Sequence, residues 1–475
     1  MLSAASVVLL LLFASAAIFD AAAATDPRWP PRHPHVGPGD GRRGARRHML
    51  PRRQEPSGDG FLRAPMRTKS IDEATTGGTH GLLPKRWSYS GIGGPAALGK
   101  RETNLREYRG LIYLIDLKIG SPAQTVSVIV DTGSYELWVS PNCTRSVDQQ
   151  LCRRTGAYHP RQSSTADHIG GRRHLVYGTG EALGEYWLDT IGAAAGVGGG
   201  LQVPLVQFIV ANDSNYAFAG VLGMGYTYPW TTPYPYTLLQ MMWAYGLIKA
   251  PIFSLALGGT GGGESEIIFG GVNLYKYRGR LEPVRVWPPI EKQDPSWLQY
   301  SVNVTSFGIT QPGDTRSDPL IDLAPARGDP LTKTTTMIID SGSTLSYGPP
   351  SLVHAIAARF NSTRVDGAGN FWVDCAHRDQ RGSIDFGFND GNLTVSVKYS
   401  DFIWMQYPGG CLLGMQPADA GSTDYVLGAT FLRGAYLVFD QETDIVWMGS
   451  YRNCGDGVVP VGVEYADAQS KVGRC

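Results

Sequence analysis

The chain has 475 residues, of which 42% are hydrophobic and 18% are charged. This length is too great for one compact domain and predicts two or three. The 60 glycines, 31 prolines and 23 tyrosines favour a loop-rich β protein and argue against a helical bundle or a coiled coil. Beyond the N-terminus, no stretch approaches the roughly 20 apolar residues that would span a bilayer.

The formal net charge of zero hides two regions of opposite charge. Residues 25–101 contain 15 Lys and Arg against 6 Asp and Glu, whereas residues 102–475 contain 27 against 35. A basic leader therefore precedes an acidic body. An acidic body argues against a nucleic-acid partner.

Residues 1–24 are a short apolar run followed by small residues. This pattern predicts a secretory signal peptide, and hence a secreted, extracellular protein. The alternative, a buried N-terminal helix, fits poorly with the polar stretch that follows.

Residues 25–101 are rich in Pro, Gly and Arg and show neither helical nor strand periodicity, so we expect a basic propeptide. They contain five pairs of basic residues, which invite a kexin-type processing protease in a secreted chain. We favour cleavage after the pair Lys100-Arg101, because the first strand pattern begins just beyond it. This basic leader over an acidic body could act as an inhibitory prosegment, released as acid protonates the body; the alternative is a tail that is only trimmed.

Six cysteines follow the leader, and an even number in a secreted chain predicts three disulfides. Although 15 connectivities are possible, proximity in sequence favours Cys143–Cys152, Cys375–Cys411 and Cys454–Cys475. No Cys or His cluster suggests a metal, so we expect none. Five Asn-X-Ser/Thr sequons make a glycosylated surface plausible: Asn142, Asn212, Asn303, Asn361 and Asn392.

From residue 111 onward, short alternating or apolar runs are separated by Gly, Pro and Asn, which predicts an all-β fold. The expected strands include 112–119, 127–130, 205–211, 252–257, 267–269 and 435–439. Helical patterns cover only 236–245 and 351–360. Residues 192–200 are expected to form a linker or hairpin tip, and residues 311–335 an exposed loop.

The most informative feature is a motif that occurs twice. Residues 128–134 read VIVDTGS and residues 337–343 read MIIDSGS. Each copy has a distant companion of two apolar residues and a glycine, with Gly223 92 positions after Asp131 and Gly428 88 positions after Asp340. This repeat predicts two related lobes about a pseudo-twofold axis, on which the two aspartates meet.

Two carboxyl groups in contact cannot both ionise easily, so they share one proton over a broad pH range. The ionised partner can take a proton from water while the protonated partner polarises a carbonyl. This arrangement predicts general acid–base catalysis without a covalent intermediate.

Further motifs make the chain resemble the pepsin-like aspartic proteases, and in particular their secreted fungal, candidapepsin-like branch. The resemblance covers about residues 108–451, and its motifs are IGSP at 119–122, LWV at 137–139, YGTG at 177–180, IFGGV at 268–272 and TFLR at 430–433. It implies a bilobal pepsin-like fold with pseudo-twofold related lobes, an N-terminal lobe at 102–285, a C-terminal lobe at 286–475 and a central cleft. It also implies a monomer that binds an extended protein or peptide substrate, prefers apolar residues at the scissile bond and needs no cofactor.

By this resemblance Asp131 and Asp340 are the catalytic pair. The residues expected to support the two loops are Thr132, Gly133, Ser134, Ser341, Gly342 and Ser343. The two serines at the ends of these motifs would each hold the neighbouring aspartate, while Thr132 and Ser341 would bond the opposite lobe's backbone. The flap and substrate-binding residues would be Tyr177, Gly178, Thr179 and Trp138, with the indole of the last donating to the tyrosine hydroxyl.

The sequence departs from the family at Ala429, where many acid-active members have an aspartate. Losing this charge near the pair would change its titration, so we expect acidic activity whose optimum is either ordinary for the family or nearer neutral. An optimum below about pH 3 would count against this expectation. A non-catalytic pepsin-like binding or inhibitor protein is the main alternative. A glycoside hydrolase needs more widely spaced carboxylates, and the C-terminus lacks the hydrophobic tail of a lipid-anchored protease.

Overall fold

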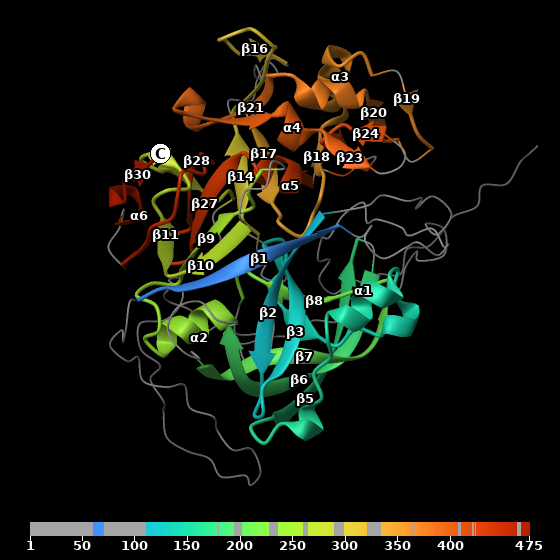
Figure 1. Cartoon of the computed structure of the whole chain (residues 1–475), viewed down its shortest axis with the longest axis vertical. Helices are drawn as coiled ribbons and strands as arrows, with labels where there is room; N and C mark the ends of the chain where they lie inside the picture. The colour runs from blue at the N-terminus through green and yellow to red at the C-terminus, as the bar shows by residue number, and fades with distance from the viewer. Residues whose placement is uncertain are drawn as a thin grey trace, which may run out of the picture. The chain divides into compact units, whose positions relative to one another are not determined.

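Strands are the main regular structure in the part of the chain that the structure describes. The computed structural model describes residues 60–70, 111–178, 180–193, 202–227, 236–259, 265–288, 299–320, 334–362, 364–367, 369–406, 410–419, 422, 424–462 and 467–475. The signal peptide, the pair Lys100-Arg101 and Thr179 lie outside these residues. Figure 1 shows the described elements with the labels used below.

The largest sheet has 13 strands and includes segments from both of the expected lobes. In spatial order it consists of β13 (Glu282–Arg285), β28 (Ile445–Ser450), β27 (Ala435–Asp440), β9 (Ile252–Ala256), β10 (Ser265–Phe269), β1 (Leu62–Ser70), β2 (Leu111–Ile119), β3 (Gln124–Asp131), β8 (Gly220–Gly223), β4 (Leu137–Val139), β7 (Gln202–Asn215), β6 (Gly180–Ala193) and β5 (Asp167–Tyr177). The strand patterns expected at 112–119, 127–130, 205–211, 252–257, 267–269 and 435–439 fall on strands of this sheet, except that Leu257 lies just past the end of β9.

The repeat in the sequence is also a repeat in strand pairing. β3 runs parallel to β8, with Asp131 opposite Gly223. In the second copy β17 (Thr335–Ile339) runs parallel to β26 (Tyr425–Leu427). A third strand follows each aspartate and pairs antiparallel with the companion strand, β4 in the first copy and β18 (Ser346–Gly348) in the second. The distant glycine motifs are therefore the strands beside the two aspartates.

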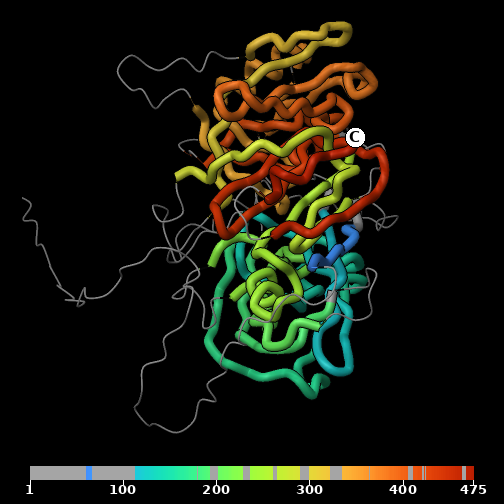
Figure 2. Tube along the Cα trace, turned by 90° about the vertical axis from the view of Figure 1, so that its left-hand side faces the viewer, coloured from blue at the N-terminus to red at the C-terminus, as the bar shows by residue number. Residues whose placement is uncertain are grey.

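The remaining strands form five smaller sheets. In spatial order, the five-stranded sheet consists of β14 (Ser301–Val304), β17, β26, β18 and β25 (Met415–Pro417). Two four-stranded sheets consist of β16 (Asp318–Pro319), β15 (Ser306–Thr310), β21 (Ser383–Phe388) and β22 (Leu393–Lys398), and of β19 (Arg364–Val365), β20 (Phe371–Val373), β24 (Gly410–Leu412) and β23 (Trp404–Gln406). Two further pairs are β11 (Gly271–Asn273) with β29 (Val458–Pro460) and β12 (Arg278–Gly279) with β30 (Gly473–Arg474). The last two pairs bring the C-terminal residues back to the middle of the chain, and Figure 2 shows this red segment beside the yellow-green one.

The described helices are short. They are α1 (Gln149–Arg154), α2 (Leu238–Ala244), α3 (Pro350–Arg359), α4 (Tyr399–Phe402), α5 (Ala429–Leu432) and α6 (Asp467–Ser470). The expected helices at 236–245 and 351–360 correspond to α2 and α3, and α2 begins at Thr237 with a capping box that includes Gln240. No described helix is long and apolar enough to cross a membrane.

The structure forms the three disulfides that sequence proximity favours: Cys143–Cys152, Cys375–Cys411 and Cys454–Cys475. It differs from the sequence analysis in the leader, where no strand was expected. Residues Leu62–Ser70 form β1, and the side chains of Ala64 and Met66 are buried in the main core. The alternation that buries these two side chains is interrupted in sequence by Pro65 and surrounded by basic residues, which hides it in a Pro- and Arg-rich segment.

Candidate active site

Two buried loops carry the repeated aspartates. β3 ends at Asp131 and β17 ends one residue before Asp340, so two apolar strands deliver carboxyl groups into the interior. Each carboxyl group is 1% exposed. In each loop the backbone N–H two residues further on donates to the aspartate Oδ1, at 2.8 Å from both Gly133 and Gly342. The side chain of Asp131 is also in hydrogen-bonding contact with that of Asp340, so the structure brings the two repeats together.

Crossed hydrogen bonds join the two loops. The Thr132 hydroxyl donates to the carbonyl of Ile339 at 2.9 Å, and the Ser341 hydroxyl donates to the carbonyl of Val130 at 2.8 Å. Each hydroxyl also accepts from the other residue's backbone N–H, at 2.9 Å for Thr132 and 3.1 Å for Ser341. The contacts expected of this pair are therefore present, and they are reciprocal.

The glycines of the two loops are required by close approach. A Cβ atom on Gly133 would lie 2.7 Å from Cγ of Asp340, and one on Gly342 would lie 2.6 Å from Oδ1 of Asp131. Contacts this short do not occur in folded proteins, so each glycine lets its loop touch the opposite carboxyl group.

The serines that follow these glycines differ between the two loops. Ser134 donates to Oδ2 of Asp131 at 2.5 Å, as the resemblance implies. The Ser343 hydroxyl instead donates to the carbonyl of Leu345 at 3.0 Å, so its hydrogen is directed along its own loop. The repeat in sequence gives no sign of this difference.

Burial raises the pKa of Asp131 above its ordinary value. Hydrogen bonds from Ser134, Asp340, Gly133 and Gly342 oppose the effect of burial by stabilising the carboxylate. Two buried carboxyl groups in contact are expected to hold one proton between them. The pair can then accept a proton at one oxygen and donate one at another.

A hairpin made by β5 and β6 ends close to this pair. Tyr177 is the last residue of β5, pairs with Gly180 across the turn and is 5% exposed. Its hydroxyl accepts a 2.8 Å hydrogen bond from the indole nitrogen of Trp138. Burial, reinforced by the negative charge of Asp131, raises the pKa of Tyr177 well above 10, so it keeps its phenolic proton. Gly178 is exposed at the turn.

Sequence reasoning missed Glu136, a 4% exposed carboxyl group five residues after Asp131. The hydroxyl of Tyr186, from β6, donates to its Oε1 at 2.8 Å, and Nε of Arg173, from β5, lies 3.5 Å from the same oxygen. Burial raises the pKa of Glu136 to about 8. A single acidic residue within the run YELWV that follows the first aspartate motif was the available signal.

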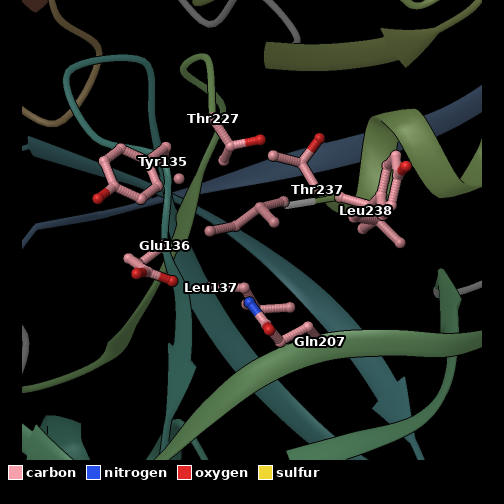
Figure 3. Close-up of a pocket in the computed structure, with 10 residues that line it drawn as sticks. Tyr135, Glu136, Leu137, Gln207, Thr227, Thr237 and Leu238 are labelled. Carbon is pink, nitrogen blue, oxygen red and sulfur yellow. The ribbon is translucent and has the colours of Figure 1, made fainter. Parts of the chain in front are cut away.

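A small cavity of about 10 Å³ lies beside this residue (Figure 3). Its lining consists of Tyr135, Glu136, Leu137, Gln207, Leu222, Gly223, Thr227, Tyr236, Thr237 and Leu238. This volume is about enough for one water molecule and far too small for a substrate side chain. Among the described residues, no three His, Cys, Asp or Glu side chains gather as metal ligands.

A paired-aspartate site on two repeated β motifs, with a tyrosine hairpin beside it, is the arrangement expected of an aspartic protease. The family model for the eukaryotic aspartyl protease matches residues 112–450. The chain therefore belongs to the eukaryotic aspartyl protease family, and it is an aspartic-type endopeptidase.

Curated relatives agree with this assignment. A probable aspartic-type endopeptidase of Aspergillus oryzae is 30% identical over 74% of this chain and 71% of its own length. Secreted aspartic protease 5 of Candida albicans is 31% identical over 70% of this chain and 74% of its own. The crystal structure of the aspartic proteinase of Irpex lacteus is 20% identical and covers 72% of this chain and 94% of that one, with a TM-score of 0.55. This last similarity supports the bilobal all-β fold.

Proposed function

We propose that Asp131 and Asp340 are the catalytic residues of a secreted endopeptidase that is made as a zymogen. A water molecule held between the two carboxyl groups attacks the peptide carbonyl, one aspartate accepting its proton while the other donates one. The observation that carries this assignment is the buried hydrogen-bonding contact between the two side chains. No covalent intermediate is needed.

Further parts of the site have supporting roles. The crossed bonds of Thr132 and Ser341 keep the two carboxyl groups at a fixed separation. The hairpin that ends at Tyr177 closes over an extended peptide and excludes water from it. Apolar side chains are preferred beside the scissile bond, and the peptide is aligned by backbone hydrogen bonds as an added strand.

The working pH is acidic but above about 3. Ala429 is buried, and its backbone N–H donates to the carbonyl of Ser343 at 2.8 Å, so this residue touches the second catalytic loop directly. An aspartate in its place would put a negative charge next to the pair and change its titration.

The test expresses the full chain, lets it be processed, and compares the resulting wild-type enzyme with the Asp131→Asn and Asp340→Asn variants. The assay measures cleavage of a quenched apolar peptide across pH 2–8. We expect each substitution to lower kcat by about 10³-fold or more, because half of the acid–base pair is lost. Asp314→Asn is the matched control, since that carboxyl group is exposed. A statine-type inhibitor should block the wild type.

Two results would contradict the proposal. A folded wild-type protein that binds the peptide without cleaving it would indicate a pepsin-like binding protein. Equal activity of the wild type and both substituted proteins would show that the aspartates are not catalytic.

A further inference from the structure

Two buried tyrosines occupy matching places beside the two aspartate motifs. Tyr113 on β2 immediately precedes the residue that pairs with the second residue before Asp131. Tyr300 immediately precedes the residue of β14 that pairs with the second residue before Asp340. The two tyrosines are 1% and 0% exposed. The duplication of the aspartate motif therefore extends to a pair of aromatic residues that lie outside the motif in the sequence.

Tyr300 connects the two aspartate loops through its backbone and its side chain. Its backbone carbonyl accepts the N–H of Ile339, the residue before Asp340, at 3.0 Å. Its hydroxyl donates to the carbonyl of Met224 at 2.9 Å, and the N–H of Met224 in turn donates to the carbonyl of Asp131 at 2.8 Å. One residue therefore joins the strand that leads to one aspartate to the backbone beside the other.

The Tyr300 hydroxyl is held in one direction by its surroundings. The side-chain amide of Gln441, a 4% exposed residue, donates to this hydroxyl at 2.7 Å and lies 3.3 Å from the carbonyl oxygen of Met224. Burial, reinforced by the negative charges of Asp444 and Asp440, raises the pKa of Tyr300 far above its ordinary value of 10. The hydroxyl therefore stays a proton donor throughout the acidic and neutral range.

Tyr113 makes the corresponding link in the opposite direction, with one residue inserted. Nε of Arg433 donates to the Tyr113 hydroxyl at 3.2 Å, and the backbone N–H of Arg433 donates to the carbonyl of Ala429 at 3.1 Å. The N–H of Ala429 in turn donates to the carbonyl of Ser343 in the second loop. This link runs through a long side chain with many rotatable bonds, so it constrains the loops less tightly than the direct link of Tyr300.

We infer that Tyr300 and Tyr113 are positioning residues of the active site, which fix the separation of the two aspartates together with the crossed hydroxyl bonds, and that Tyr300 has the larger effect. The inference rests on the proposed catalytic role of Asp131 and Asp340. Two carboxyl groups share a proton only while they stay in contact, so a looser link between their loops weakens the sharing. A misplacement of about 1 Å at reacting groups costs up to about 100-fold in rate.

The test is Tyr300→Phe in the full chain, expressed and processed as for the activity assay. This change keeps the ring and removes two hydrogen bonds. We expect kcat for the quenched peptide to fall about tenfold while KM changes less than about twofold, because the alignment of the pair is lost and the binding surface is kept. The acidic and basic limbs of the pH profile of kcat should move closer together, since weaker sharing narrows the range in which the pair holds one proton. Tyr113→Phe should lower kcat only about threefold.

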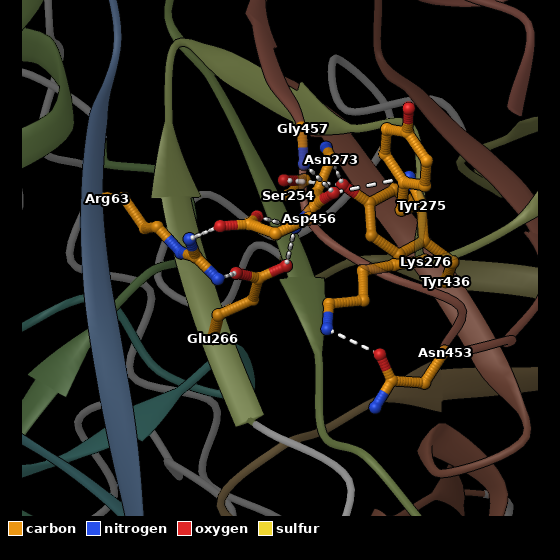
Figure 4. A network of polar contacts seen from close by, with 10 residues as sticks. All are labelled: Arg63, Ser254, Glu266, Asn273, Tyr275, Lys276, Tyr436, Asn453, Asp456 and Gly457. Carbon is orange, nitrogen blue, oxygen red and sulfur yellow. Dashed lines mark hydrogen bonds and ion pairs between the residues drawn. The ribbon is translucent and has the colours of Figure 1, made fainter. Parts of the chain in front are cut away.

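Tyr436→Phe is the matched control, at a tyrosine that lies in a separate polar cluster (Figure 4). The Tyr436 side chain is also fully buried, and its hydroxyl accepts the N–H of Asn273 at 2.7 Å and donates to Oγ of Ser254 at 3.0 Å. This variant should lose as much stability in urea unfolding as Tyr300→Phe but keep the wild-type kcat and pH profile. If the two variants have the same kcat and the same pH profile, the inference is wrong.

A second measurement does not depend on activity. Hydrogen–deuterium exchange of the folded proteins reports the opening of the two loops, and Tyr300→Phe should make the amides of residues 131–134 and 340–343 exchange about tenfold faster. Tyr436→Phe should leave both loops as they are in the wild type. Faster exchange in an inactive wild-type background would mean that the proposed function fails and the link between the loops stands. Unchanged exchange of both loops in an active enzyme would refute the link alone.

Discussion

The two loops that carry Asp131 and Asp340 are alike where they face each other and different where they face away. At the first three positions, Asp131 to Gly133 and Asp340 to Gly342, both loops use a glycine N–H on the aspartate and a hydroxyl on the opposite backbone. At the sixth position one loop has Glu136 and the other has Leu345. Glu136 meets the two strands of the tyrosine hairpin, whereas Leu345 packs in an apolar cluster.

This difference shows which parts of a duplicated motif are constrained by the symmetry axis. Residues next to the axis touch their own twins, so a change on one side needs a matching change on the other. Residues farther from the axis contact other elements, such as the hairpin of β5 and β6, and not their own twins. Functional asymmetry in this site is therefore expected at Glu136 and at the serines, and not at the glycines.

The strongest test of the symmetric part is to add one methyl group to each loop. Gly133→Ala places a Cβ atom 2.7 Å from Cγ of Asp340, and Gly342→Ala places one 2.6 Å from Oδ1 of Asp131. We expect either change to separate the carboxyl groups and lower kcat/KM by at least about 10³-fold, which is about 4 kcal/mol. The comparison predicts losses of similar size from the two loops.

The control for these variants is Gly367→Ala, because a Cβ atom there meets nothing within 4 Å. Circular dichroism should show a folded protein in all three cases. If Gly133→Ala loses activity while Gly342→Ala stays active, the two loops are not equivalent at the axis.

The asymmetric part is tested by Glu136→Gln and its effect on stability against pH. The folded pKa of about 8 lies above the ordinary value of 4.5, so the folded protein binds the proton more tightly than the unfolded chain. The stability from this group is complete below about pH 4.5 and is lost as the pH rises to 8. The shift corresponds to at most about 5 kcal/mol, and the nearby Arg173 cation, which favours the carboxylate, reduces our expectation to about 3 kcal/mol.

Urea unfolding at pH 4.5 and pH 8 measures this effect. The wild type should lose stability between the two values, and Glu136→Gln should lose about 3 kcal/mol less. Asp379→Asn, at an exposed carboxyl group, should follow the wild type. Parallel pH dependence in the wild type and Glu136→Gln would show that this carboxyl group is not the asymmetric element.

The sequence predicted those features that the repeat itself encodes. The repeated motif predicted that the two aspartates meet, and the structure adds that each distant glycine run is a strand parallel to the one that leads to its aspartate. The disulfides followed from proximity. The crossed hydroxyl bonds followed from the resemblance, and the structure has them.

What the sequence did not predict depends on contacts between distant segments. Glu136 becomes buried only because Arg173 and Tyr186 arrive from two later strands. The direction of the Ser343 hydroxyl depends on the local path of the backbone to Leu345. β1 was missed because its pairing partners lie on both sides of it in space, and Pro65 together with the surrounding charges resembles a linker.

The smallest expected effect concerns the crossed hydroxyls. Thr132→Val and Ser341→Ala each remove two buried hydrogen bonds between the loops, so each should lower the free energy of unfolding by about 2 kcal/mol. All four bonds join the same two loops, so the two losses are coupled and the double variant should cost about 3 kcal/mol, less than the sum. Ser343→Ala, which removes a single bond within its own loop, should cost about 1 kcal/mol. If the losses in free energy of unfolding, measured with urea, are strictly additive, the Thr132 and Ser341 bonds stabilise the loops independently. The position of both residues next to the axis would then not couple them.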